Sequence, residues 1–233
     1  MPPLPSPLLS PLLGSLNAPH FFSTRDAGDL AGNDAADAFI HARWPERTLV
    51  RCRQVHGAAA LPVHSGGART APDADALVTA EVRTIVAIQT ADCVPILLAT
   101  LDGAVVAAIH AGWRGVVNGV VTNALALVRS LTDQPIFAAV GPCISKAAFE
   151  VGPEVADAFR TRFGADADTL IAAGRADRSH VDLVKAVALQ LRAGVKDIDV
   201  TAALCTVGDP RFFSYRRDAG TTGRMMAGIG PAL

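Results

Sequence analysis

One stretch of the chain, residues 84–115, restricts the possible folds more than any other. It reads TIVAIQTADCVPILLATLDGAVVAAIHAGWRG and contains three apolar runs, rich in Val and Ile, that are separated by two short polar interruptions. Runs of this length and composition are typical of buried strands, and Asp102-Gly103 between the second and third runs is typical of a turn. We therefore expect adjacent buried strands with the polar residues at the strand ends.

Two reactive side chains occupy these expected strand ends. Cys93 lies in the first interruption, and His110 ends the run AVVAAIH shortly before a helical pattern from Val116 to about Arg129. In open α/β sheets, ligands bind outside the carboxyl ends of strands and near helix N-termini. A thiol and an imidazole at one rim of a sheet therefore suggest a functional site.

Strand and helix patterns also fill the rest of the sequence, which favours one α/β domain without internal repeats. Strands are expected near 21–25, at 48–55, 76–78, 136–140 and 198–204, and after Arg224. Helices are expected at 34–44, 153–164 and 182–194. Residues 64–75 predict a surface loop, and the proline-rich residues 1–20 predict an extended arm, since they lack the basic start of a signal peptide.

Composition indicates which partners and surroundings to expect. Half of the 233 residues are apolar, the formal net charge is −1, and the 21 Lys and Arg residues are scattered. This distribution argues against a nucleic-acid-binding surface and favours small-molecule partners. The four cysteines form no CxxC pair, which favours reduced thiols in a cytoplasmic protein. No apolar run reaches the length of a membrane span, so no membrane partner is expected.

His56, Cys93 and His110 are candidate metal ligands, because all three lie at predicted strand ends. Two imidazoles and one thiolate suit Zn²⁺ and leave a fourth position open, as in catalytic zinc sites. The histidines could instead bond to backbone groups, and Cys93 could be a small buried apolar residue. A further alternative makes Cys93 a nucleophile that His110 activates and Asp92 orients.

The segment Gly112-Trp113-Arg114-Gly115 precedes a predicted helix and could direct N–H groups and a guanidinium at an anion. It matches neither a Walker loop nor GxGxxG, so it does not support nucleotide-triphosphate or dinucleotide binding. A tight turn with a surface arginine is the alternative. Arg216 and Arg217 could also bind an anion or be solvated, and Cys143 follows a predicted strand directly.

Eight motifs together resemble the YfiH family, which is also called the laccase-domain or polyphenol oxidase family and includes a peptidoglycan editing factor. They are QVHG (54–57), ADALVT (74–79), TADCVPILLA (90–99), HAGWRG (110–115), GPCI (141–144), FEVG (149–152), CT (205–206) and FFSYRRD (212–218). The resemblance covers about residues 21–230. It implies a mixed β-sheet flanked by helices in a layered sandwich over residues 21–233, and a zinc held by His56, Cys93 and His110.

The activity implied by this resemblance is purine nucleoside phosphorolysis, with adenosine deamination and methylthioadenosine phosphorolysis as further possibilities. The expected catalytic residues are Cys93, Asp92, Gln54 and Arg114, and the expected substrate-binding residues are Arg43, Arg114, Cys143 and Arg217. A cysteine hydrolase or amidase acting on cell-wall precursors and a non-catalytic metal- or nucleoside-binding protein are the alternatives. We expect a monomer or homodimer.

The sequence departs from the family pattern in the region expected to face the substrate. The family's TRxGG is TRDAG at 24–28, the loop that follows is shortened to residues 29–34, and the Tyr of YEVG is Phe149. Copper is possible but not favoured as the metal. The chain has six histidines and no HxH pair, whereas a multicopper oxidase needs many imidazoles for its copper cluster.

Overall fold

The computed structural model describes residues 6–64 and 70–233. Residues 1–5 of the expected arm and residues 65–69 of the expected loop lie outside this description. Within the described residues, a five-stranded sheet has the order β1 (His20–Phe22), β14 (Met225–Ile229), β6 (Thr84–Thr90), β2 (Thr48–Arg53) and β4 (Thr70–Asp73). A six-stranded sheet has the order β13 (Asp197–Asp199), β9 (Ile136–Val140), β7 (Val94–Thr100), β8 (Val106–Ala111), β5 (Ala76–Thr79) and β3 (Ala60–Val63).

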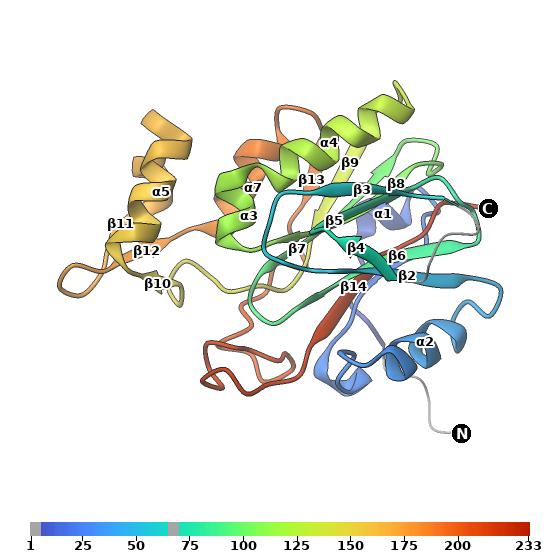
Figure 1. The fold of residues 1–233 in the computed structure, drawn as a ribbon, viewed down its shortest axis with the longest axis horizontal. Helices are drawn as coiled ribbons and strands as arrows, with labels where there is room; N and C mark the ends of the chain where they lie inside the picture. The colour runs from blue at the N-terminus through green and yellow to red at the C-terminus, as the bar shows by residue number, and fades with distance from the viewer. Residues whose placement is uncertain (1–5, 65–69) are drawn as a thin grey trace.

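The two sheets form the middle of a layered sandwich (Figure 1). One apolar core lies between the sheets, and a second separates the five-stranded sheet from α2 (Asn33–His41). The third and largest core lies between the six-stranded sheet and the helices α3 (Trp113–Asn118), α4 (Val120–Leu131) and α7 (Leu183–Leu191). Both sheets contain parallel and antiparallel pairs, which confirms the expected mixed α/β sandwich.

The layered arrangement explains the continuous apolar runs, because the central strands are buried on both faces. In β7, Ile96 and Leu98 face the helices, while Leu97 and Ala99 face the other sheet. The hairpin of β7 and β8 confirms the turn predicted between them, where Gly103 has φ +66°. The first apolar run was expected beside these strands, but it forms β6 of the opposite sheet.

A smaller unit extends from one end of the sandwich, at the left of Figure 1. It consists of a three-stranded sheet in the order β10 (Glu150–Val151), β12 (Ser179–Val181), β11 (Ile171–Ala173), together with α5 (Pro153–Phe163) and α6 (Ala167–Leu170). Short 3₁₀ turns occur at Arg25–Ala27 and Gly164–Asp166. The helix predicted at 153–164 is therefore confirmed as α5.

Four local predictions need correction. The helix expected from Val116 is two helices, because Gly119 between α3 and α4 has φ +90°. Residues 200–204 leave the strand pattern after β13, and residues 70–73 of the expected loop form β4 beside β2. The described part of the arm is not extended throughout, since α1 (Pro11–Gly14) buries Leu13.

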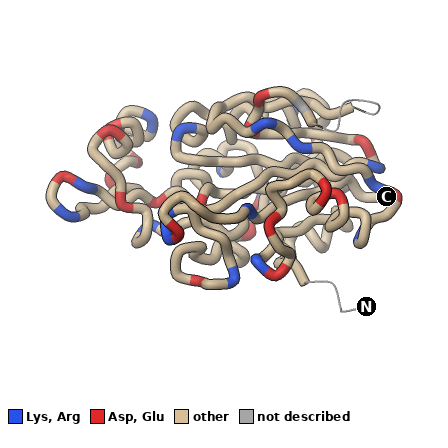
Figure 2. Tube along the Cα trace, turned by 60° about the horizontal axis from the view of Figure 1, so that its bottom comes forward, with Lys and Arg blue, Asp and Glu red and all other residues tan. Residues whose placement is uncertain are grey.

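Surface charge follows the expectation from composition. Acidic and basic residues are interspersed along the chain trace rather than separated into two regions (Figure 2). The four cysteines are all free. None of the helices in the described part of the chain is both long and apolar enough to span a bilayer.

Candidate metal centre and cleft

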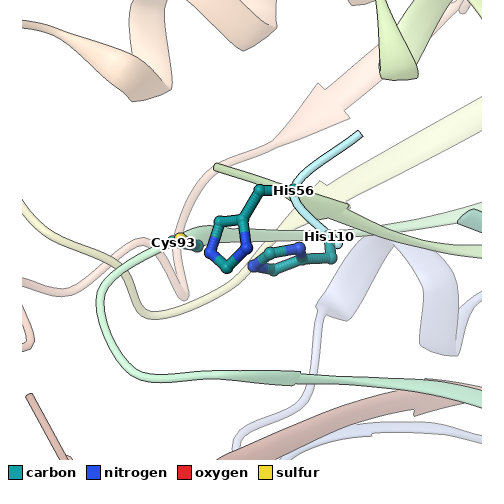
Figure 3. A group of neighbouring side chains, drawn as sticks. All are labelled: His56, Cys93 and His110. Atoms are coloured by element: carbon teal, nitrogen blue, oxygen red, sulfur yellow. The ribbon is translucent and has the colours of Figure 1, made fainter. Parts of the chain in front are cut away.

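Three segments from different parts of the fold bring His56, Cys93 and His110 together. His56 follows β2 of one sheet, whereas Cys93 precedes β7 and His110 lies in β8 of the other. Their ligand atoms lie within 4.8 Å of one another, and the three side chains converge (Figure 3). The two imidazole rings meet edge to face at 82°, with 4.8 Å between centroids. The predicted juxtaposition of these three residues is confirmed.

A buried carboxylate, Asp75, organises two of the three ligands. It accepts hydrogen bonds from the backbone N–H groups of Val55, His56 and Gly57 at 3.2, 3.0 and 2.6 Å. It also accepts a 2.7 Å bond from Nδ1 of His110, and its side chain is fully buried. A carboxylate only accepts, so Nδ1 carries a proton toward Asp75, and Nε2 is the nitrogen that a metal would bind with release of any proton there.

The hydrogen bonds to Asp75 also keep this buried carboxylate ionised. Burial acts to raise its pKa, but the bonds from His110, Gly57 and Val55 outweigh that effect and lower the pKa. Sequence analysis assigned Asp75 no role, although it lies within the motif ADALVT. The signal that could have identified it is an acidic residue at the entrance to an apolar strand, where a charge needs partners.

The backbone at the candidate metal centre has two unusual features. His56 has φ +57°, a left-handed conformation that non-glycine residues rarely adopt, and Asp75 holds it there through the adjacent N–H groups. Gly112 lies against the ligands. A Cβ at this position would lie 3.0 Å from Cδ2 of His56 and 3.1 Å from Sγ of Cys93. Gly112, the first glycine of HAGWRG, therefore lets the backbone approach the candidate ligands closely, and a side chain here would push on them.

Electrostatics favour a thiolate at Cys93. Burial acts to raise the pKa of Cys93, but the charges and hydrogen bonds of His110 and His56 lower it to about 6. Burial likewise acts to lower the pKa of His110, but the negative charges of Cys93 and Asp75 and their hydrogen bonds raise it to about 9. A metal ion needs a deprotonated thiol, so the site presents this ligand in its binding form.

The donor set and its surroundings fit a metal ion. Two imidazoles and a thiolate are the donors that Zn²⁺ prefers, and ligand atoms within 4.8 Å need only small movements to reach bonding distances of about 2.0–2.3 Å. The bond from His110 to Asp75 is the outer hydrogen bond that metal-bound imidazoles usually make. Among the described residues, these three form the one group of this kind.

The metal-binding group lies in a cavity of about 680 Å³, a size typical of small-molecule sites. Besides the three ligands, its lining includes Gln54, Asp92, Arg114, Phe149, Tyr215 and Arg216. The guanidinium of Arg114 lies 4.4 Å from the centroid of the Trp113 ring. Within the described part of the chain, no hydrogen bond or ion pair engages this guanidinium, which leaves it available to an anion.

Two expected catalytic residues line the cavity but have their polar atoms engaged by the protein. Nε2 of Gln54 donates to the carbonyl of Gln89 at 2.8 Å, and Oε1 accepts from the N–H of Gln89 at 2.7 Å. Gln54 therefore fixes the segment before His56 to β6. The carboxylate of Asp92 accepts from Thr206 and from the backbone of Arg216.

Three expected substrate-binding residues, Arg43, Cys143 and Arg217, are not among those that line the cavity. Arg43 follows α2, donates to the carbonyl of Phe39 and stacks on the Phe39 ring. Cys143 is 1% exposed, and burial raises the pKa of its thiol. Arg217 pairs with Asp218 and donates to the carbonyls of residues 206 and 212, so it stabilises its own loop. The sequence motifs indicated that these residues lie near the cleft. They did not indicate in which direction the side chains point.

Fold and cleft together define a two-sheet α/β protein with a histidine- and cysteine-lined candidate metal centre. The chain belongs to the family described as multi-copper polyphenol oxidoreductase laccase, whose sequence model matches residues 22–232. This match confirms the resemblance to the laccase-domain family that the motifs indicated.

Curated relatives with similar sequences carry a different functional name. A protein of Deinococcus radiodurans named purine nucleoside phosphorylase is 39% identical over 94% of this chain and 92% of the relative. A Mycobacterium tuberculosis protein named purine nucleoside phosphorylase is 40% identical over 89% of this chain and 85% of its own.

Solved structures show the same fold. A Neisseria meningitidis protein aligns with a TM-score of 0.80 at 32% identity, over 93% of this chain and 95% of its own. The YlmD protein of Geobacillus stearothermophilus aligns with a TM-score of 0.82 at 28% identity, over 93% of each chain. The YfiH protein of Bacillus licheniformis aligns with a TM-score of 0.86 over 97% of each chain, and at 24% identity this likeness concerns the fold alone.

Proposed function

We propose that this protein is a zinc-dependent purine nucleoside phosphorylase. The observation that carries the proposal is one cavity that combines a His-Cys-His group with Arg114, whose guanidinium has no hydrogen bond or ion pair among the described residues. The names of the Deinococcus and Mycobacterium relatives support the reaction. Purine nucleoside and phosphate are the proposed partners, and the proposed location is the cytoplasm.

In the proposed reaction, a phosphate oxygen forms a bond to C1′ of the ribose while the bond from C1′ to the purine breaks. The purine leaves with the bonding electrons. Arg114 binds and orients the phosphate, and its positive charge offsets the repulsion between phosphate and the departing base. Phe149 and the exposed ring of Tyr215 provide aromatic surface for the nucleoside. Zinc, when bound, would act as a Lewis acid.

Zinc is the proposed metal because of the ligands available. A multicopper oxidase needs a second cluster of imidazoles. Of the remaining histidines, His20 is buried against the backbone of residues 10 and 18, and His180 lies near Lys146 and Glu150 in the smaller sheet. Neither is among the residues lining the cavity. The family description as a copper protein is thus not matched by a copper-cluster ligand set in the described residues.

The test is product identification together with metal analysis. Purified protein is incubated with adenosine or inosine, with and without phosphate, and its zinc content is measured in the same preparation. We expect about one zinc per chain and phosphate-dependent formation of free base and ribose 1-phosphate. The proposal extends to adenosine deamination, which the same assay detects as inosine, and to methylthioadenosine phosphorolysis, which a separate incubation with methylthioadenosine and phosphate detects as free adenine. Absence of phosphate-dependent cleavage from a zinc-loaded preparation would refute the phosphorylase assignment.

A cysteine hydrolase acting on a cell-wall precursor is the second candidate. The observation that favours it is a row of three contacting side chains. The low-pKa thiol of Cys93 faces the imidazole of His110, which the carboxylate of Asp75 orients. A thiolate bound to zinc is not free to attack a carbonyl. The test measures hydrolysis of a cell-wall precursor. Hydrolysis that increases when zinc is chelated, and that iodoacetamide abolishes, would select this candidate over the phosphorylase.

A further inference from the structure

Asp92 has an unusual position directly before the ligand Cys93. Its backbone is in the left-handed region, with φ +98°, and the residue is 8% exposed. Its Oδ1 accepts a 2.5 Å bond from Oγ1 of Thr206, and its Oδ2 accepts a 2.7 Å bond from the N–H of Arg216. Its carbonyl also accepts from the N–H of Ile144 at 2.9 Å. Three segments of the chain are therefore fixed to this one residue.

Thr206 and Arg216, which donate to the carboxylate of Asp92, belong to a loop that forms part of the cavity wall. We call residues 206–224 the wall loop, because they contribute Tyr215, Arg216 and Arg224 to the cavity lining. Arg216 is held a second time, since its guanidinium donates to the carbonyls of Ala148 and Glu150 at 3.2 and 2.9 Å. The loop thus approaches the cavity from a position that Asp92 helps to set.

The engaged carboxylate argues against a direct chemical role. One oxygen is bonded to a hydroxyl and the other to a backbone N–H, so neither is left facing the cavity without a donor. A group in this arrangement positions its neighbours rather than exchanging protons with a substrate. Because the next residue is a metal ligand, any restraint on Cys93 acts on Asp92 through a single peptide unit.

We infer that Asp92 is a positioning residue that couples the metal ligand Cys93 to the wall loop, so that metal binding also arranges Tyr215 and Arg216 for the substrate. A bond from Cys93 to zinc restricts the first residues of β7. The two hydrogen bonds of the carboxylate carry that restriction to Thr206 and Arg216, which lie 114 and 124 residues away in sequence. The substrate part of this inference rests on the proposed phosphorylase function, whereas the coupling itself does not.

The coupling can be followed without any activity measurement. Tyr215 is the single tyrosine of the chain, so uniform incorporation of 3-fluorotyrosine places one ¹⁹F resonance on the wall loop. Protein stripped by a chelator is titrated with zinc, and zinc content confirms that each variant is loaded. We expect the resonance to shift on zinc addition in the wild type, and the shift to fall at least twofold in Thr206→Val and in Asp92→Gly, which removes both acceptor oxygens at a position whose φ of +98° suits glycine.

Thr222→Val is the matched control for this experiment. Oγ1 of Thr222 donates to Oδ2 of Asp218 at 2.8 Å within the same loop, so the variant removes the same kind of bond without affecting Asp92. It should retain the full zinc-induced shift. Equal shifts in the wild type, Asp92→Gly and Thr206→Val would overturn the inference, because the metal would then act on the ring without Asp92.

A double-mutant cycle adds a quantitative test. Thr206→Val should weaken zinc binding about tenfold and raise KM for adenosine more than it lowers kcat, within the range of outer-shell effects. In an Asp92→Gly background the same change should add less than twofold, since the carboxylate that accepts this bond is already removed. Thr206→Val is also the milder variant if Asp92→Gly fails to fold. Independent, multiplicative effects of the two changes would overturn the coupling.

The outcomes of these experiments distinguish a failure of this inference from a failure of the proposed function. If adenosine is not cleaved but the ¹⁹F shift and zinc affinity depend on Asp92, the coupling stands and the phosphorylase assignment fails. If adenosine is cleaved but the shift does not depend on Asp92, the coupling fails and the assignment stands.

Discussion

Several side chains in the cleft hold other residues in place instead of facing a ligand. Asp75 fixes the backbone of residues 55–57 and the ring of His110, and Gln54 joins the same segment to β6. Each of these groups is buried or half-buried, so an unpaired polar atom there would be costly. The left-handed residues His56 and Asp92 are stable because such hydrogen bonds restrain the backbone next to them. The geometry of the candidate metal centre therefore depends on residues outside the group of potential ligands.

Asp75→Asn should weaken zinc binding about 10- to 100-fold, the range typical of lost outer-shell partners. An asparagine amide would direct N–H donors at a carboxylate position that now receives donors from His110 and three backbone groups. Competition with a chelating dye measures the zinc dissociation constant. Asp102→Asn, in the turn between β7 and β8, should leave this constant unchanged. Equal zinc affinity in Asp75→Asn and wild type would show that the carboxylate does not orient the ligands.

Arg114→Ala should raise KM for phosphate at least tenfold and KM for adenosine much less. The guanidinium lines the cavity and is engaged by no carboxylate in the described residues, so its charge is available to phosphate. Arg114→Lys should recover part of the loss, because it restores the charge but not the planar fork of donors.

Steady-state kinetics with each substrate varied in turn gives both constants for Arg114→Ala. Arg160→Ala is the control, because Arg160 is exposed on α5 and paired with Asp157. A defect confined to the nucleoside would mean that Arg114 contacts the ribose or base instead.

Glycines allow close backbone contact between three elements. These are the end of β2, the end of β8 and the start of α3. A Cβ on Gly115 would lie 2.9 Å from the carbonyl of Gly57, so the motifs QVHG and HAGWRG are in direct contact. The spacing of His56 and His110 is thus set by how closely two strand-end segments pack, which larger residues would change.

Gly112→Ala should reduce bound zinc to well below one per chain without unfolding the protein. The added methyl group would push on Cδ2 of His56 and Sγ of Cys93, while φ at this position, −71°, suits alanine. Metal analysis and circular dichroism measure the two effects. Gly32→Ala is the matched control, since Gly32 precedes α2 with φ −71° and nothing lies within 4 Å of the new Cβ. Normal zinc content in Gly112→Ala would contradict the contact.

The whole molecule is stabilised by three apolar layers, and the layer between the sheets determines where the candidate metal ligands meet. His56 belongs to the strand end of one sheet, and Cys93 and His110 to strand ends of the other. Packing of the two sheets therefore brings the first ligand to the other two. A change in that core should lower global stability first and alter the ligands only through the relative position of the sheets.

Leu97→Ala should lower the free energy of unfolding by about 2–5 kcal/mol, because Leu97 is fully buried between the sheets and its removal leaves a cavity. Equilibrium denaturation in urea measures this loss. Leu101→Ala, four residues along the chain and 50% exposed, should change stability by less than about 0.5 kcal/mol. Comparable losses in the two variants would contradict the sandwich arrangement.

Phenol oxidation by this protein should be slow even with added copper, and the protein should lack the intense blue absorption of a copper-thiolate centre. Only His56 and His110 of the six histidines belong to a group of potential metal ligands in the described residues. Any oxidation rate should be unaffected by His64→Ala or His180→Ala. Rapid, copper-stoichiometric oxidation that either change abolishes would overturn both this prediction and the zinc assignment.

The sequence by itself predicted the central buried strands of both sheets and the reactive residues near their ends. The β7 and β8 hairpin follows from local patterns, because a turn between two apolar runs needs only neighbouring residues to form. The same patterns placed His56, Cys93 and His110 at strand ends, and the family motifs selected them as one group. Local periodicity also predicted α5 and α7 near their observed bounds.

Tertiary structure alone decided how those segments combine. Sequence patterns did not show that β6 pairs in the opposite sheet, that residues 200–204 leave the strand, or that Asp75 supports the ligands. Strand pairing and buried hydrogen bonds join residues far apart in the chain, and apolar runs pair about equally well with several partners. The partners of Asp92 lie 114 and 124 residues away, so no local signal identified them. Only folding brought these donors to one carboxylate, where burial makes each hydrogen bond necessary.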